Sequence, residues 1–409
     1  MRWQLRGLWK NPDFMKVWLS HTISNIGNGI TGIALPVIAV AVLDATPGQM
    51  SVLSALDGIV VCIFGLLAGV WVDRLRRRPV LIATDLGRAL VVASVPVAAL
   101  LGILHLEQLY IVAALAALLS VFFHAADVAF FPGLVEAREL VEGNSKLGIS
   151  DALAEIAGPA LAGALIAAIT APLSIVVDAF SFLASALFVA RIRKPEQAPV
   201  APGERRGAWH ESIEGLLYVL KHPLLRVLAG SAGVFNFFGM FFATLYALYV
   251  IRILGIAPFL YGLLIAAGGL SALVGAVLTE RVVRLFGLGL AIGGGLFMYG
   301  CVGLLVPFAH GPVAVVAIIL FMSQLVGDVT VSVYLIAEVS LRQMLIPGHL
   351  LGRANAGILF LTRGVAPLGA LLAGILAEHI GARPTLFIAV LGVMMAGLWV
   401  LLSPVRRVR

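Results

Sequence analysis

The chain has 409 residues, of which 61% are apolar and only 12% are charged. It carries 28 Lys and Arg against 21 Asp and Glu, a formal net charge of +7. Soluble globular domains are typically about 45–50% apolar and about 25% charged. The composition therefore excludes an ordinary soluble enzyme, a disordered chain and a secreted disulfide scaffold. It predicts a membrane protein with many spans, and since the basic residues lie in short loops, we expect no nucleic-acid partner.

The apolar residues gather into twelve stretches, each close to the roughly 20 residues that a membrane-spanning helix needs. We therefore predict an all-α membrane protein with twelve transmembrane helices. The first stretch is too long for a signal-peptide core and is interpreted as a retained helix. The predicted spans are 17–43, 50–72, 79–101, 107–131, 149–169, 173–191, 226–250, 259–280, 287–307, 312–337, 354–376 and 384–403.

Basic residues divide unequally between the loops on the two sides of the membrane. Counting from the N-terminus, 24 of the 28 fall on one side and two on the other, while Arg88 and Arg363 lie within spans. Cytoplasmic loops carry the excess of Lys and Arg. We therefore expect a multi-pass protein of the inner (plasma) membrane with both termini in the cytoplasm.

The segment 193–222 is rich in Pro and charge and divides the spans into six plus six. We predict a bundle over 1–192, a cytoplasmic linker over 193–222 with an amphipathic helix in Trp209–Leu220, and a bundle over 223–409. The halves repeat each other at an offset of 211 positions, which pairs Ser20 with Ser231, Asn25 with Asn236, Asp127 with Glu338, Asn144 with Asn355, and Gly163 with Gly374. Two parallel-repeated six-helix bundles are typical of one transporter architecture.

Several motifs resemble those of the major facilitator superfamily, and in particular its branch of drug:proton antiporters that includes macrolide and enterobactin exporters. The run from Gly69 to Arg78 is similar to the superfamily's loop signature G-x-L-x-D-R-x-x-R-R, with Trp71 in place of Leu. The resemblance implies a conformational latch at Gly69, Asp73, Arg74, Arg78, Asp85 and Arg88. The alternative is that the loop arginines only anchor the topology.

Span five carries Gly158, Pro159 and Gly163, which resemble the G-P-x-x-G-G motif of antiporters, although Ala162 departs from it. A second departure lies in span one. Members of the branch often have an acidic residue where this chain has Asn28, and an asparagine cannot titrate. If the family couples transport to protons at that position, this chain must use another residue.

A polar stripe runs along span one, where His21, Asn25 and Asn28 share one helix face. Such groups are not exposed to lipid, so they face protein or a water-filled cavity. We predict a substrate cavity lined by these three residues and by Asn236, Phe237 and Tyr246 of span seven. The alternatives are hydrogen bonds between helices for the polar groups and simple packing for the aromatic ones.

Acidic residues within spans are costly and mark functional sites. We predict proton coupling at Asp328, Asp57, Asp127 and Glu338, with hydrogen-bonded structural acids as the alternative. Asp127 and Glu338 can pair with Arg88 or Arg363, and Asp151 and Glu155 can compete for Arg88. A His124–Asp127 relay is also considered, and Asp178 is assigned a structural role.

No phosphate-binding Walker loop, metal-ligand cluster or nucleophile–base pattern is found in the sequence. We therefore expect no enzyme activity, no catalytic residues, no cofactor and no metal. The resemblance implies export of small amphipathic molecules in exchange for protons by a monomer in the lipid bilayer. The alternatives are a siderophore or lysophospholipid transporter of the same fold, or a membrane sensor that does not transport.

Overall fold

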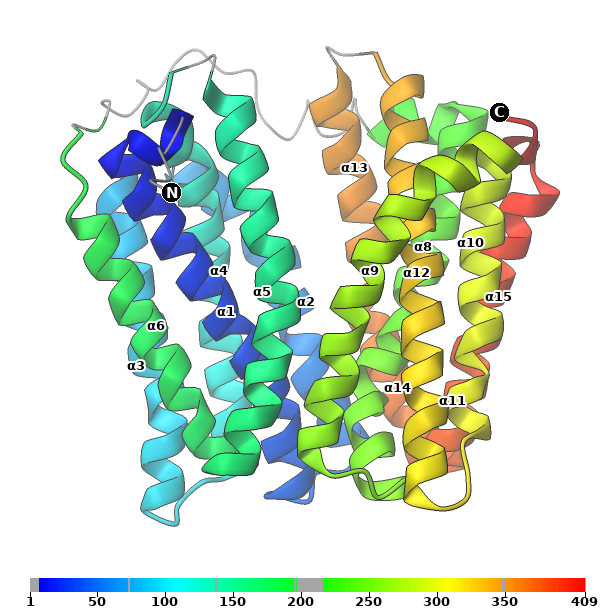
Figure 1. The fold of residues 1–409 in the computed structure, drawn as a ribbon, viewed down its shortest axis with the longest axis horizontal. Helices are drawn as coiled ribbons and strands as arrows, with labels where there is room; N and C mark the ends of the chain where they lie inside the picture. The colour runs from blue at the N-terminus through cyan, green and yellow to red at the C-terminus, as the bar shows by residue number, and fades with distance from the viewer. Residues whose placement is uncertain are drawn as a thin grey trace, which may run out of the picture. The chain divides into compact units, whose positions relative to one another are not determined.

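The computed structural model describes residues 7–72, 74–136, 139–194, 196, 216–347 and 350–408. Within these ranges every regular element is a helix, and twelve helices are long and apolar enough to cross a membrane. The prediction of an all-α protein with twelve spans is therefore confirmed. In the first half the long helices are α1 (Pro12–Ala41), α2 (Pro47–Val72), α3 (Arg77–Leu100), α4 (Leu106–Phe130), α5 (Leu140–Ala168) and α6 (Ala171–Ala190) (Figure 1).

The second half repeats this order with more breaks. It contains α8 (Pro223–Leu248) with the π-helical turn Tyr249–Ile253, α9 (Pro258–Phe286), α10 (Leu288–Gly303), α11 (Leu305–Phe308), α12 (Val313–Leu345), α13 (Leu351–Arg363), α14 (Ala366–Ile380) and α15 (Ala382–Leu402). Predicted span nine corresponds to α10 and α11, and predicted span eleven to α13 and α14. The latter break falls at Gly364 and Val365, just before Pro367. Proline cannot donate the helical N–H bond and its ring clashes with the preceding turn, which explains an interruption here.

The helix boundaries follow local rules. Pro12, Pro47, Pro223 and Pro258 stand at the first positions of their helices, where the missing N–H costs nothing. Asn11 caps α1 through its side-chain oxygen, which accepts from the backbone N–H groups of residues 13 and 14. Because these signals precede the apolar runs, most helices begin one to nine residues before the predicted spans. The largest extension at a start is at α5, which begins at Leu140 rather than 149, and the largest at an end is at α12, which ends at Leu345 rather than 337.

The chain forms two compact units, Met1–Leu43 with Val60–Pro202, and Asp44–Ile59 with Gly203–Arg409. In the first unit α1 packs against α5 and α6, and α3 packs against α4 and α6. In the second unit α8 packs against α13, α14 and α15, and α10 packs against α12 and α15. The two sets of helix pairs correspond along the sequence repeat. The predicted first bundle contains all of residues 1–192. In the structure residues 44–59, which include the start of α2, belong to the second unit instead.

Equivalent contacts show that the repeat extends to packing. Ser20 Oγ lies 2.7 Å from Ser185 Oγ in the first unit. At the same offset of 211, Ser231 Oγ donates to the carbonyl of Ala396 at 3.0 Å in the second. The same pair of helices is therefore joined at the same level in both units.

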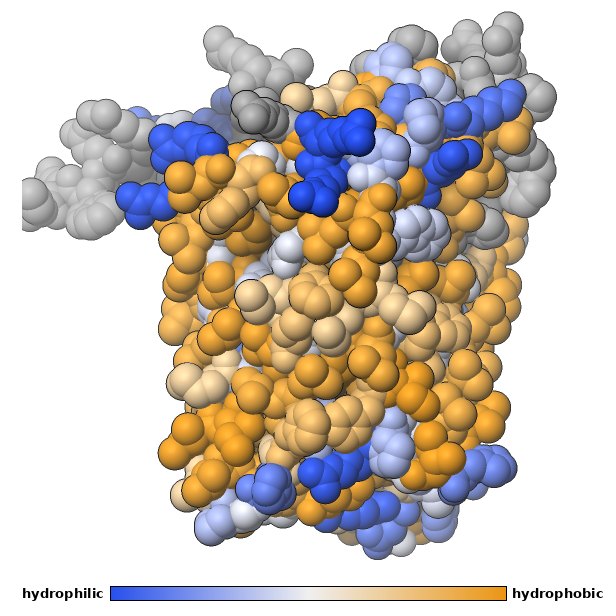
Figure 2. Space-filling model, turned by 90° about the vertical axis from the view of Figure 1, so that its right-hand side faces the viewer, coloured by the Kyte–Doolittle hydropathy of each residue, from blue (hydrophilic) through white to orange (hydrophobic). Residues whose placement is uncertain are grey.

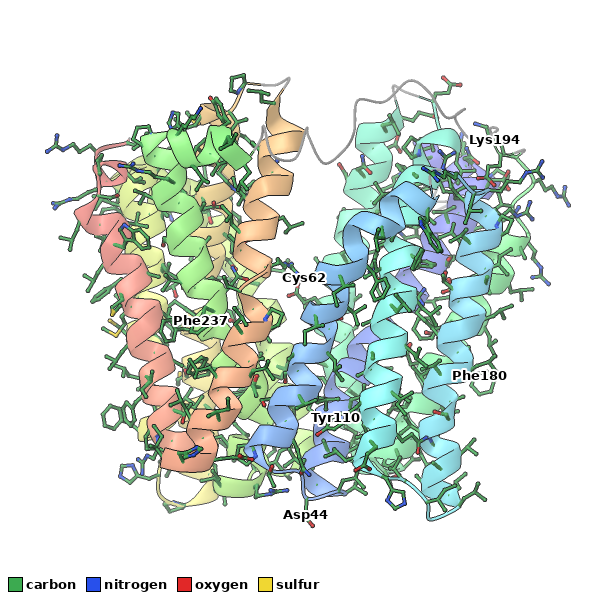
Figure 3. The ribbon with its side chains drawn as sticks, turned by 180° about the vertical axis from the view of Figure 1, so that it is seen from behind. Asp44, Cys62, Tyr110, Phe180, Lys194 and Phe237 are labelled. Atoms are coloured by element: carbon green, nitrogen blue, oxygen red, sulfur yellow. The ribbon has the colours of Figure 1, made fainter. Side chains whose placement is uncertain are left out.

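The helix ends carry the polar contacts outside the apolar interior. Asp13 accepts bonds from the Lys16 ammonium and from the backbone N–H groups of Arg193 and Lys194, which ties the start of α1 to the segment after α6. Lys194 is labelled in Figure 3. In the turn after α1, Asp44 has a left-handed φ of 51° and lies 3.3 Å from the Arg252 guanidinium. Figure 2 shows one face on which a wide apolar band separates polar residues at its two ends, as expected for a surface in contact with lipid.

Part of the predicted linker lies outside the described residues. The N-terminal portion of the predicted amphipathic helix, residues 209–215, belongs to that part, and residues 216–221 are helical. Asp73 of the loop motif is also outside the described residues.

Candidate transport site

The first unit brings four polar side chains of three helices together. His21 Nε2 on α1 lies 2.7 Å from Asp151 Oδ1 on α5, and its Nδ1 lies 3.4 Å from Asp127 Oδ2 on α4. Asn25 donates to the same Asp151 oxygen at 2.7 Å. The imidazole thus stands between two carboxylates, and in its protonated form it pairs with both of them.

The sequence places His21 and Asn25 in one polar stripe and Asp127 apart from it, and the structure brings all three into one cluster. A relay between His124 and Asp127, three residues apart on one helix, is one of the interpretations considered above. In the structure the histidine beside Asp127 is His21, while His124 contacts the ring of Phe123. Only the packing of α1 on its neighbours brings His21 and Asp127 together, and no local pattern carries that information. Asn28, the third member of the stripe, is half-buried.

A second polar group lies wholly inside the first unit. Arg88 Nη2 is 2.5 Å from Asp85 Oδ1 on the same helix, and both side chains are fully buried. Ser185 of α6 donates to the other Asp85 oxygen at 2.6 Å. The guanidinium lies between two aromatic rings, 4.1 Å from the Phe123 centroid and 4.3 Å from that of Phe182. Cation–π contacts in such a desolvated place each contribute about 2 kcal/mol.

The first turn of α3 is joined to the end of α6 and to the segment that follows it. Arg78 donates to the carbonyl of Ala190, and the Glu196 carboxylate accepts from the backbone N–H groups of Arg77 and Arg78. Glu196 therefore caps the N-terminus of α3, where a negative charge is favoured. Arg74 is exposed, and Gly69 lies in the last turn of α2.

Gly158 of the antiporter-like motif lies where α5 crosses α1. A Cβ atom built on Gly158 would lie 2.8 Å from Gly29 Cα and 3.2 Å from the Ile26 carbonyl oxygen. Pro159 follows inside α5, and Gly163 is buried one turn later. In this structure the motif provides a close backbone crossing.

The second unit contains a cavity of about 230 Å³ around Asp328 of α12. Its walls include three tyrosines and a phenylalanine, and Gln324 donates to Asp328 Oδ2 at 2.5 Å. Gly268 of α9 leaves room for this pair, because a Cβ there would lie 2.2 Å from Asp328 Oδ2. The aromatic residues that line the cavity are Phe242, Tyr246, Tyr261 and Tyr299.

A second cavity in the same unit, of about 470 Å³, contains the repeat partners of the first unit's cluster. Glu338 Oε1 and Arg342 Nε are 2.9 Å apart, but the N–H does not point at the oxygen, so their contact is mainly electrostatic. Arg363 lines the same cavity, and so does Asn236, which donates to the backbone carbonyl of Ala232. The equivalent site of the first unit contains a histidine and two acids, whereas this one contains one acid and two arginines.

Two further candidates lie apart from these groups. Asp57 is exposed on α2. Phe237, labelled on α8 in Figure 3, contacts the rings of Phe238 and Phe241 and lines neither of the two cavities described above.

Twelve spanning helices in two repeated bundles, with polar clusters inside the bundles, define a secondary-transporter type of membrane protein. The family model described as Major Facilitator Superfamily matches residues 17–361. The chain therefore belongs to the major facilitator superfamily, a family of transporters rather than enzymes.

Two of the curated relatives are similar over nearly the whole length of this chain, and a third is similar over about half of it. The MFS-type transporter YfiS of Bacillus subtilis (strain 168) is 27% identical over 95% of this chain and 92% of its own. The multidrug efflux pump Tap of Mycobacterium bovis (strain BCG / Pasteur 1173P2) is 26% identical over 97% of this chain and 94% of its own. Tap of Mycolicibacterium fortuitum is 30% identical over 54% of this chain and 55% of its own.

Solved structures of transporters share the fold at lower identity. A variant of the nucleoside transporter NupG has a TM-score of 0.78 at 10% identity, covering 95% of this chain and 99% of its own. A bacterial homologue of the iron transporter ferroportin, in an inward-facing state, has a TM-score of 0.73 at 19% identity. The match covers 97% of this chain and 99% of that protein's chain. These similarities establish the fold and not the substrate.

Proposed function

We propose that this chain exports small amphipathic molecules in exchange for protons, by alternating access of its two bundles. The observation that carries the proposal is the cavity around Asp328, where aromatic walls and a carboxylate meet at one place inside the second unit. Aromatic side chains offer apolar surface to a flat or greasy group, and the carboxylate and Gln324 offer polar contacts to its other end. The multidrug efflux pumps among the relatives support export of such molecules.

The size of the cavity bears on what it can hold. Pockets for whole drug-sized ligands typically measure about 300–1,000 Å³. At about 230 Å³ this cavity suits one group of a larger substrate rather than the whole of it. In this proposal Tyr246 and its neighbours bind that group, and Asp328 exchanges a proton as the substrate enters or leaves.

The remaining coupling candidates are grouped by their surroundings. Asp127 acts through His21, since the imidazole can accept and release a proton between two carboxylates. Glu338 acts beside Arg342, and Asp57 acts from the exposed side of α2. The loop arginines and the Asp85–Arg88 pair form the conformational latch. Both termini lie in the cytoplasm, as the distribution of basic residues favours.

The test uses inverted membrane vesicles with an imposed proton gradient and a pH-sensitive dye. We expect one class of compound among macrolides, cationic dyes, siderophores and lysolipids to dissipate the proton gradient, which changes the dye signal. We expect Asp328→Asn to abolish this signal. Glu280→Gln is the matched control, because Glu280 is an exposed acid near the end of α9 and should leave the response unchanged. If only siderophores or only lysolipids dissipate the gradient, the chain transports that class and not drug-like molecules. No response to any compound, with folded protein and an intact gradient, would refute proton-coupled export.

A further inference from the structure

One face of α1 is polar where it packs against α6 in the first unit. Ser20, Ser24, Gly27 and Thr31 recur at intervals of three and four residues, so they lie on one side of the helix. Ser20 contacts Ser185, and Thr31 donates to Asp178 Oδ2 at 2.5 Å. A Cβ on Gly27 would lie 2.2 Å from Asp178 Oδ1, so that glycine leaves space for the acid.

The seam between α1, α3 and α6, defined here by Asp85, Arg88 and Asp178, contains two carboxyls and one guanidinium. The three side chains are 0%, 1% and 0% exposed. Asp85 is paired with the guanidinium of Arg88. Asp178 is bound by hydroxyl groups, those of Thr31 and of Ser181 at 2.9 Å, and its described hydrogen bonds include no cation.

Counting charges in the seam shows an imbalance. Arginine stays protonated in proteins, so two ionised carboxyls would leave one negative charge without a counter-charge. An unpaired carboxylate in an apolar interior is so costly that the group takes up a proton instead. Arg88 already neutralises the charge of Asp85. Asp178 is therefore the carboxyl that takes up the proton.

The sequence repeat provides an internal comparison. In the second unit the positions equivalent to Asp85, Arg88 and Asp178 are Leu296, Tyr299 and Ala389. Leu296 and Ala389 are both fully buried there. The same arrangement of helices therefore packs without charges at this level. Because buried ion pairs are often no more stabilising than apolar residues of similar volume, packing alone does not account for the charged seam.

Some buried polar atoms of the seam have no hydrogen-bond partner among the described residues. Ser24 is 1% exposed, lies between Ser20 and Thr31 on the polar face of α1, and its hydroxyl has no partner among the described residues. Arg88 Nε and Nη1 also have none within that part of the chain. Buried polar atoms without a hydrogen-bond partner are rare in native proteins and are not expected of a purely structural polar cluster.

Other titratable groups near α6 are accounted for. On α1, His21 is paired with Asp127 of α4 and Asp151 of α5. On α5, Glu155 is exposed. On α3, Asp85 and Arg88 contact α6 within the seam, through Ser185 and Phe182, and Arg78 binds the carbonyl of Ala190 at the far end of α6.

We propose that Asp178 is a proton-binding site of the first unit, distinct from Asp328 and from the His21 cluster. The carboxyl holds one proton in the state described here. The use of this proton in transport rests on the proposed function, whereas its presence on Asp178 does not.

Infrared spectroscopy of the purified protein in D₂O near neutral pD measures the protonation directly, without any substrate. We expect the difference spectrum of the parent protein minus Asp178→Asn to contain the carbonyl-stretching band of a protonated carboxyl, and the same difference for the exposed-acid control Glu280→Gln to lack it. Absence of the band from the Asp178→Asn difference spectrum would overturn the proposal. A band that appears only after sodium is replaced by choline would assign the site to a metal cation instead.

A milder variant covers the case in which Asp178→Asn does not fold. Thr31→Val removes one hydrogen bond to the carboxyl and keeps the shape of the side chain. A protonated Asp178 predicts a shift in the position of the band, and an unshifted band would contradict the assignment. If the infrared band depends on Asp178 as expected but no compound dissipates the gradient in vesicles, Asp178 is a proton-binding site and the proposed coupling to transport is refuted.

Discussion

Replacement of Gly158 by alanine tests whether the antiporter-like motif is a helix crossing. The added Cβ would lie 2.8 Å from Gly29 Cα, whereas ordinary contacts begin at 3.4 Å. The neighbours are backbone atoms, so α1 and α5 must separate by about 0.6 Å. Overpacking of this kind typically costs about 1–3 kcal/mol. Gly148→Ala on the same helix is the control, because nothing lies within 4 Å of its Cβ.

Comparing the two variants cancels the gain in helix propensity, about 0.5–1 kcal/mol, that any glycine-to-alanine change in a helix brings. For a folding unit of this size each kcal/mol shifts Tm by about 2–4 °C. We therefore expect Gly158→Ala to unfold about 2–12 °C below Gly148→Ala, measured by tryptophan fluorescence in one detergent at one heating rate. Equal unfolding temperatures would refute the crossing as the reason for the glycine.

Two other substitutions probe the charged seam and the Asp328 cavity. Arg88→Leu leaves Asp85 buried without its counter-charge, a loss of about 3–5 kcal/mol, so we expect little monodisperse protein by size-exclusion chromatography. The double variant with Asp85→Leu should recover most of the monodisperse protein. A double variant that yields as little monodisperse protein as Arg88→Leu would contradict the pairing. Gly268→Ala should push the Asp328 carboxyl into the cavity and weaken the apparent substrate affinity in vesicles about tenfold. Gly294→Ala, which has open space around its Cβ, should leave that affinity unchanged.

The fold was predictable because membrane helices are set by local composition. Each apolar run long enough to span the bilayer becomes a helix, since lipid offers the backbone no other partners. The repeat was predictable because matching residues recur at a constant offset in the sequence. Ser20 and Ser231, one such pair, make equivalent contacts on equivalent helices. The helix ends were less accurate, because capping residues such as Asn11 and the terminal prolines lie outside the apolar runs.

The grouping of polar residues could not be predicted to the same extent. A helical pattern shows which residues share a face, as with His21 and Asn25, but not which helix that face meets. The partner of Asp127 lies 106 positions away on α1, and a search of its own helix finds only His124. Sequence distance therefore offers His124 as a partner, whereas the structure places His21 beside Asp127. Correct pairing requires the packing of three helices, and this chain's local sequence does not specify it.

The repeat, however, separates what packing requires from what function adds. Gly158 faces the Ile26 carbonyl, and at the same offset Gly369 faces that of Phe237, so both units keep this crossing. Asp178, by contrast, has Ala389 as its equivalent. A feature present in both halves is explained by the shared architecture, whereas a buried charge present in one half needs a reason of its own. From this comparison we infer that the charged seam of the first unit and the Asp328 cavity of the second serve different functions.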